Sequence, residues 1–81
     1  MMTPEQVREM IAVGLPDAQV EVRSDDNTHF EAVVVSAGFE GQRSIHRHQA
    51  VYRTLGQYMG REIHALSLRA FTPEELARQG G

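Results

Sequence analysis

The sequence predicts a small α+β domain in which three strands form one mixed sheet with helices packed on it. Two observations support this fold class. Helical and strand patterns of apolar residues follow one another in the order α-β-β-α-β-α along the 81 residues. The second strand, the long helix and the third strand form a crossover unit, which favours a parallel pair of strands with a right-handed connection. Helices must cover one face of this sheet for so short a chain to bury a core.

Length and composition indicate a single domain over residues 1–81, with an ordered core over about residues 4–78. The chain contains no cysteine, so any metal must be held by His, Asp, Glu or the ligands of a partner. The absence of cysteine fits a reducing cytoplasm, which is the location we expect. No apolar segment approaches the ~20 residues that a membrane span needs. The N-terminal segment also lacks the pattern of a signal peptide, so we expect no membrane association.

The first helix has strong start and stop signals. Thr3 can cap it, Pro4 suits its first turn, and Gln6 lies where a capping box places its acceptor. Gly14 and Pro16 are expected to end it.

An antiparallel hairpin is predicted next. Residues 18–23 alternate, with Val20 and Val22 on one face, and residues 29–36 form a second β-rich run. The polar segment SDDNT between them is short, which favours direct antiparallel pairing. Hairpin chemistry suffices to explain the Asp25-Asp26 pair in this turn.

The long helix is predicted over residues 45–59, with Ser44 as its candidate cap and Gly60 as its stop. The apolar run IHALSLRA, residues 63–70, is the predicted third strand. The T-P-E tripeptide that opens the first helix recurs at 72–74 and opens a short last helix. We interpret this repetition as shared capping chemistry and not as an internal repeat.

The histidines are the candidate metal ligands, because neutral imidazole is the commonest metal ligand in proteins. His29 opens the second strand and His64 opens the third. The parallel crossover brings both strand starts to the same end of the sheet, so the two imidazoles are predicted to share a rim. The residues alone favour a competing interpretation, in which His64 is half-buried and its ring bonds the backbone. His48 is expected to pack on the apolar stripe of its helix, and His46 to be exposed.

The loop GFEG has the G-x-x-G pattern with which KH domains clamp a nucleic-acid backbone. Gly38 and Gly41 would form this clamp, with Arg43 and Arg47 as phosphate contacts. A solvated helix face is the interpretation that we favour, because Glu40 places a negative charge where a phosphate would approach. The net charge of −3 also differs from the basic charge that is usual for nucleic-acid-binding domains.

The sequence shows no catalytic constellation. It contains neither a G-x-x-x-x-G-K phosphate loop nor an H-E-x-x-H zinc motif. Its serines lack a supportable arrangement with His and Asp. We therefore expect a protein that is not an enzyme.

Several short motifs occur together along the chain. They are T-H-F at 28–30, F-x-G at 39–41, R-H-x-x-V-Y-x-x-L at 47–55, H-A-L at 64–66 and T-P at 72–73. In combination they resemble the BolA family, and in particular its short bacterial IbaG-like branch linked to acid stress. The resemblance covers roughly residues 4–78 and implies an α-β-β-α-β-α fold akin to the type II KH domain.

The resemblance also implies a function. BolA-like proteins pair with monothiol glutaredoxins and share a [2Fe-2S] cluster with them, for which the glutaredoxin and its glutathione supply thiolates. His64 matches the histidine that the family contributes from its H-A-L strand, and His29 is the candidate for a second ligand. The resemblance implies no cluster on the isolated protein, a monomer when alone and a heterodimer with its partner. It places the chain in iron–sulfur cluster assembly or trafficking, or in iron and stress regulation.

A DNA-binding transcription regulator is the alternative that the resemblance implies, because some members are described in this way. Its contacts would be the four residues of the KH-like surface, namely Gly38, Gly41, Arg43 and Arg47.

The sequence departs from the family pattern at two places. Relatives with a ligand in the first hairpin carry it a few residues before the strand aromatic, where Asp25, Asp26 and Asn27 stand here. His29 is the nearest substitute. Leu76 stands where many relatives have Trp, which we expect to change packing more than function.

Overall fold

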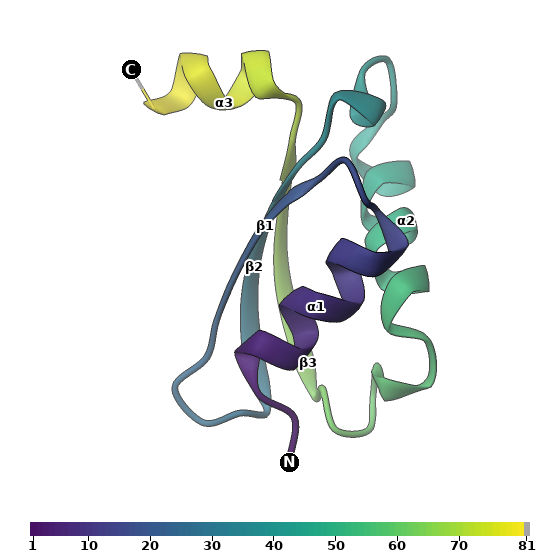
Figure 1. The fold of residues 1–81 in the computed structure, drawn as a ribbon, viewed down its shortest axis with the longest axis vertical. Helices are drawn as coiled ribbons and strands as arrows, with labels where there is room; N and C mark the ends of the chain where they lie inside the picture. Colours follow the sequence, from purple (N-terminus) through teal and green to yellow (C-terminus); the bar gives the residue numbers. More distant parts are fainter. Residues whose placement is uncertain (81) are drawn as a thin grey trace.

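The computed structural model describes residues 1–80 and confirms the predicted order of elements (Figure 1). The helices and strands are α1 (Pro4–Gly14), β1 (Gln19–Arg23), β2 (His29–Val35), α2 (Ser44–Leu55), β3 (Ala65–Phe71) and α3 (Pro73–Gly80), with short 3₁₀ helices η1 (Ala37–Phe39) and η2 (Gly56–Tyr58). The sheet order is β1-β2-β3. β1 pairs with β2 antiparallel, and β2 pairs with β3 parallel, so both the predicted hairpin and the predicted crossover are confirmed.

Both α1 and α3 begin with a capping box, in which two residues exchange side-chain-to-backbone hydrogen bonds. The Gln6 N–H donates to Thr3 Oγ1 at 3.2 Å, and the Thr3 N–H donates to Gln6 Oε1 at 2.9 Å. Thr72 and Glu75 form the same reciprocal pair, at 3.2 and 2.9 Å. Each pair satisfies two backbone donors that would lack an intrahelical partner. The shared T-P-E start is therefore a capping motif, as predicted.

The core lies between one face of the sheet and the two longer helices. Figure 1 shows α1 and α2 on the same side of the sheet, while α3 extends away from the end of β3. The largest fully buried side chains come from α1, β2, α2 and the approach to β3, and they are Val7, Ile11, Phe30, Val34, Val51, Leu55 and Ile63. The opposite face of the sheet is polar and exposed, with Glu21, Arg23, Glu31 and Arg69 along it.

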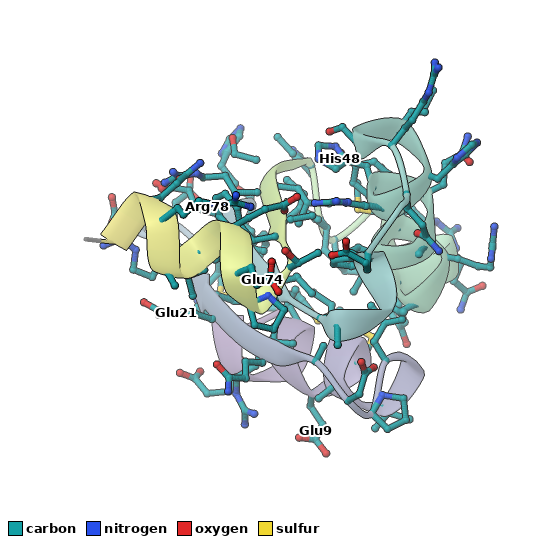
Figure 2. The ribbon with its side chains drawn as sticks, turned by 90° about the horizontal axis from the view of Figure 1, so that it is seen from above. Glu9, Glu21, His48, Glu74 and Arg78 are labelled. Carbon is teal, nitrogen blue, oxygen red and sulfur yellow. The ribbon has the colours of Figure 1, made fainter. Side chains whose placement is uncertain are left out.

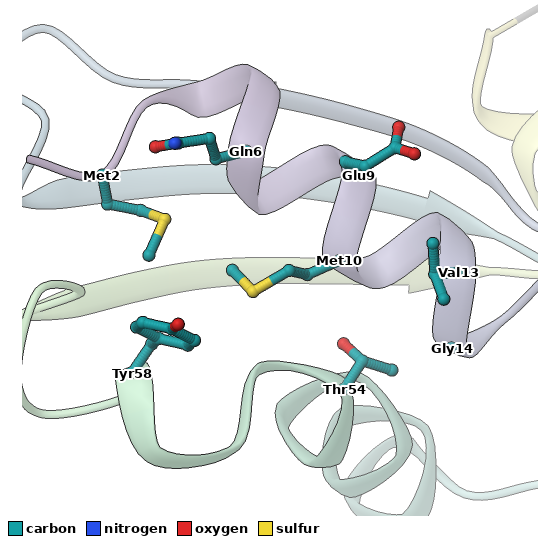
Figure 3. Close-up of a pocket in the computed structure, with 8 residues that line it drawn as sticks. All are labelled: Met2, Gln6, Glu9, Met10, Val13, Gly14, Thr54 and Tyr58. Atoms are coloured by element: carbon teal, nitrogen blue, oxygen red, sulfur yellow. The ribbon is translucent and has the colours of Figure 1, made fainter.

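α1 and α2 approach closely where Gly14 faces Thr54. A Cβ atom on Gly14 would lie 2.9 Å from Thr54 Cβ and closer still to the Thr54 methyl group. Thr54 Oγ1 donates to the carbonyl of Val51 at 2.6 Å, which fixes the orientation of that methyl group. Beside this contact lies an open groove of about 510 Å³, lined on either side by Met10 and Tyr58 (Figure 3). A side chain at residue 14 would force the two helices apart.

The long helix differs from its predicted bounds of 45–59. It starts at Ser44, which does not cap it, because Arg43 is the N-cap residue and makes no side-chain cap hydrogen bond. It ends at Leu55 because Gly56 adopts the left-handed region, with φ of 53°, and a 3₁₀ turn follows. Glycine adopts this conformation readily and so stops the helix before Gly60.

The third strand begins two residues later than predicted. Ile63 is fully buried and forms an isolated bridge with Met59, so it closes the core ahead of the sheet. Regular pairing with β2 starts at Ala65, opposite His29. His64 therefore lies in the connection that leads into β3. No helix within residues 1–80 is long and apolar enough to cross a membrane.

Candidate functional site

His29 and His64 lie together at one end of the sheet, as the crossover predicted. The parallel register pairs His29 with Ala65, which leaves His64 directly beside it. The His64 backbone N–H donates to the carbonyl of Thr28 at 2.8 Å and anchors the connection to the hairpin. The centroids of the two imidazole rings are 6.1 Å apart, with 77° between the ring planes. We call this arrangement of Asp26, His29 and His64 the histidine rim.

The turn between β1 and β2 is held by its own polar side chains. Ser24 Oγ donates to the His29 carbonyl at 2.7 Å and accepts the Asn27 N–H at 2.9 Å. Asn27 adopts a φ of 59°, a conformation that asparagine tolerates better than most residues. These contacts hold the turn so that the Asp26 carboxylate lies within hydrogen-bond distance of His29 Nδ1.

Asp26 binds both the backbone and the imidazole of the rim. Its Oδ1 accepts the His29 N–H at 2.9 Å and the Thr28 N–H at 3.0 Å. Its Oδ2 lies 2.7 Å from His29 Nδ1. The backbone N–H groups of His29 and Thr28, followed by the His29 ring, hold the pKa of Asp26 well below its usual range. Turn chemistry alone therefore does not explain Asp26. The sequence analysis missed this contact, because a D-x-x-H spacing in an aspartate-rich turn does not show which aspartate reaches the ring.

Both imidazoles of the rim are open to solvent. The His29 side chain is 64% exposed, and His64 is also exposed. The competing interpretation of a half-buried His64 with a backbone-bonded ring is wrong, because the backbone N–H and not the ring makes the contact to Thr28. Exposure leaves both rings accessible to another molecule.

The donor set of the rim fits partial ligation of a metal centre. Metal–nitrogen bonds of about 2 Å place two imidazole rings on one ion roughly 5–6 Å apart, close to the 6.1 Å observed. Two histidines on one iron are known from Rieske [2Fe-2S] centres. Within residues 1–80, no group of three or more His, Asp or Glu residues is arranged to hold a metal ion. A centre here would take its other ligands from outside the chain.

The remaining histidines lie on α2 and take no part in the rim. His46 is exposed, as predicted. His48 is half-buried and packs edge-on against Tyr52, with 6.3 Å between the ring centroids. Figure 2 shows His48 among the side chains of α2. Its predicted packing role is confirmed.

The predicted G-x-x-G loop is partly folded into the protein. Gly38 belongs to η1, and its N–H donates to Ser36 Oγ at 3.0 Å. Phe39, the next residue, is buried. Gly38, Gly41 and Arg43 are all exposed, with Gly41 at a φ of 77°. Both glycines therefore remain accessible, although Gly38 is held in a 3₁₀ turn.

Arg47 has a structural environment that the sequence did not reveal. Its side chain is 11% exposed, and its guanidinium pairs in bidentate fashion with Glu75, at 2.6 and 3.1 Å. It also donates to the carbonyls of Gln42 and Ala70, at 2.9 and 3.2 Å. Glu75 raises the pKa of Arg47. The structure thus contradicts the assignment of Arg47 as a phosphate contact, since its guanidinium is engaged inside the protein.

Comparisons with known proteins agree with this architecture. A family model described as BolA-like protein matches residues 13–75. The solved structure of a BolA protein homologue from Coxiella burnetii superposes with a TM-score of 0.86 at 43% identity, covering 96% of this chain and 100% of that chain. The fold is therefore that of the small α+β domains of the BolA type.

Named relatives show the same similarity. An acid stress protein IbaG from Escherichia coli K12 is 33% identical over 78 residues, which cover 95% of this chain and 92% of that protein. A DNA-binding transcriptional regulator BolA from Haemophilus influenzae Rd is 46% identical over 52 residues, which cover 64% of this chain and 50% of that regulator. This chain belongs to the BolA family. These relatives are named for stress and regulation and not for catalysis.

Proposed function

We propose that this chain is a non-enzymatic BolA adaptor that binds a monothiol glutaredoxin and co-ligates a shared [2Fe-2S] cluster. His64 is the principal ligand and His29 the second. Cluster assembly, trafficking, or iron and stress regulation in the cytoplasm would be its setting. The observation that carries the proposal is the pairing of two exposed imidazoles at the rim, 6.1 Å apart.

The composition of the chain supports a shared site. A chain without cysteine offers no thiolate, and the rim supplies two imidazoles. Thiolates from a partner would complete the ligand set. A bound [2Fe-2S] cluster would supply one-electron redox chemistry. Imidazole ligands raise its reduction potential relative to a cluster that is held by thiolates alone.

The test is to mix the protein with cluster-loaded glutaredoxin and record visible absorption and circular dichroism. We expect the wild type to change both spectra, and His64→Ala to abolish the change. His29→Ala should alter the spectrum without preventing the two proteins from associating. His46→Ala is the matched control, because His46 is exposed on α2 and should behave as the wild type. Spectra that are unaffected by His64→Ala would refute the ligand assignment.

A nucleic-acid-binding regulator is the second candidate, favoured by the name of the Haemophilus relative. Gly38, Gly41 and Arg43 are exposed ahead of α2, and they are the predicted contacts that remain accessible. This function predicts DNA retention that weakens steeply with added salt and is lost in Arg43→Ala. Arg8→Ala, on the exposed side of α1, is the control. Equal retention by both variants at low salt would remove this candidate.

A further inference from the structure

The contact between Asp26 and His29 determines where the proton of a neutral imidazole lies. Asp26 Oδ2 and His29 Nδ1 are 2.7 Å apart, which is hydrogen-bond distance. An ionised carboxylate only accepts hydrogen bonds, so Nδ1 must be the donor. A neutral imidazole carries a single N–H group, and its other nitrogen, Nε2, is therefore left with a free lone pair.

The orientation of the Asp26 carboxylate is fixed by hydrogen bonds to the backbone. Its other oxygen, Oδ1, is held by the backbone N–H groups of Thr28 and His29, at 3.0 and 2.9 Å. The Ser24 hydroxyl adds a longer contact to the same oxygen, at 3.3 Å. One carboxylate oxygen thus binds the turn while the other binds the ring.

Thr28 is the other group at this nitrogen, with its Oγ1 3.0 Å from His29 Nδ1. A hydroxyl can either donate or accept, so it is compatible with both tautomers. Only the carboxylate discriminates between them.

We propose that Asp26 is a positioning residue that fixes His29 as the Nδ1–H tautomer and so presents Nε2 as the metal-binding atom. Carboxylates that accept the second N–H of a ligand histidine set its tautomer and ring orientation in many metal sites. The His29 side chain is 64% exposed, so its ring stays accessible to another molecule while Nδ1 is in contact with Asp26. The metal-binding part of this inference rests on the proposed function, whereas the tautomer does not.

The tautomer can be measured on the isolated protein without any metal. Long-range ¹H–¹⁵N correlation spectra at about pH 8, above the reference His pKa of about 6.5, report which ring nitrogen of His29 carries the proton. We expect Nδ1–H in the wild type. Asp26→Asn keeps an oxygen for the backbone N–H groups but offers an N–H donor to the ring, and should shift His29 towards Nε2–H. Asp25→Asn is the matched control, since Asp25 makes no hydrogen bond to His29 within residues 1–80.

Thr28→Val provides a second variant that leaves Asp26 intact, in case Asp26→Asn fails to fold. Removing the hydroxyl should leave the Nδ1–H tautomer unchanged. A switch to Nε2–H in Thr28→Val would overturn the proposal, as would Nε2–H in the wild type or an unchanged tautomer in a folded Asp26→Asn.

Zn²⁺ titration of the isolated protein, followed through the His29 ring signals, tests the consequence for ligation. Asp26→Asn should weaken Zn²⁺ binding roughly 10–100-fold, the range found when such outer partners are lost, while Asp25→Asn should not. Equal affinity in the Asp26→Asn variant and the wild type would overturn the positioning role. The failures are distinguishable: a wild-type Nδ1–H tautomer with no glutaredoxin response would refute the proposed function alone. A His64-dependent glutaredoxin response with the wrong tautomer would refute Asp26 alone.

Discussion

Gly14→Ala should destabilise the protein, although alanine is the better helix former. The close approach of α1 and α2 leaves no room for a Cβ atom, which would lie 2.9 Å from Thr54 Cβ. Thr54 cannot rotate away freely because its hydroxyl donates to the Val51 carbonyl at 2.6 Å. The backbone of Gly14 is not in the left-handed region, so the effect isolates packing from backbone strain.

The magnitude follows from two opposing terms. Overpacking costs about 1–3 kcal/mol. Replacing a helical glycine by alanine stabilises the helix by up to about 1 kcal/mol. Taking the full gain, the net loss is up to about 2 kcal/mol, which corresponds to a Tm lower by up to roughly 8–16 °C for a domain of this size.

The assay is thermal and urea unfolding of Gly14→Ala, Thr54→Ser and the double variant. Thr54→Ser keeps the hydroxyl and removes the methyl group, so it should recover part of the loss, as a coupling energy in the double-mutant cycle. A Gly14→Ala variant that is more stable than the wild type, or a cycle with no coupling, would refute the close approach as the reason for glycine.

Three further predictions concern stability. The Arg47 hydrogen bonds hold the pKa of Glu75 at about 2, below its ordinary 4.5, so their stabilisation is present above about pH 4.5 and lost as the pH falls towards 2. Glu75→Gln should therefore remove this part of the pH dependence, as measured by Tm at pH 7, 4 and 2. Phe30→Ala opens a cavity in the core and should cost about 3–5 kcal/mol in urea unfolding, whereas a cost below about 1 kcal/mol would contradict its core position. Asn27→Gly should change stability by no more than about 0.5 kcal/mol, while Asn27→Val should cost about 1–2 kcal/mol because of the positive φ; equal melting of the two variants would contradict this.

Local patterns predicted the elements, and chain topology predicted the site. The crossover between β2 and β3 was enough to place His29 and His64 at one rim, although 35 positions separate them in the sequence numbering. The periodicity of apolar residues was less informative about where each helix and strand begins and ends. Gly56, with its positive φ, ends α2 earlier than the periodicity predicts. Ile63 lies ahead of the third strand, because its side chain is fully buried in the core.

Two contacts could not be derived from local patterns. The pairing of Arg47 with Glu75 joins residues 28 positions apart through helix packing, so neither residue revealed its partner. The bond between Asp26 and His29 is local, but any turn that is rich in aspartate looks similar in sequence. Only the conformation of the turn showed which aspartate reaches the ring.

The attachment of α3 has a consequence for the dynamics of the molecule. Its Leu76 is 38% exposed, and none of the buried core side chains within residues 1–80 belongs to this helix. The helix is fastened by its Thr72 cap and by the pairing of Glu75 with Arg47. A longer hydrogen bond, from Arg69 to Gln79 Oε1 at 3.4 Å, joins its last turn to β3. A helix that is held by polar contacts and buries no side chain in the core can open as a local unit while the rest of the domain stays folded. Amide protons of α3 should therefore exchange with solvent through this local opening, while the sheet that carries the two histidines stays folded.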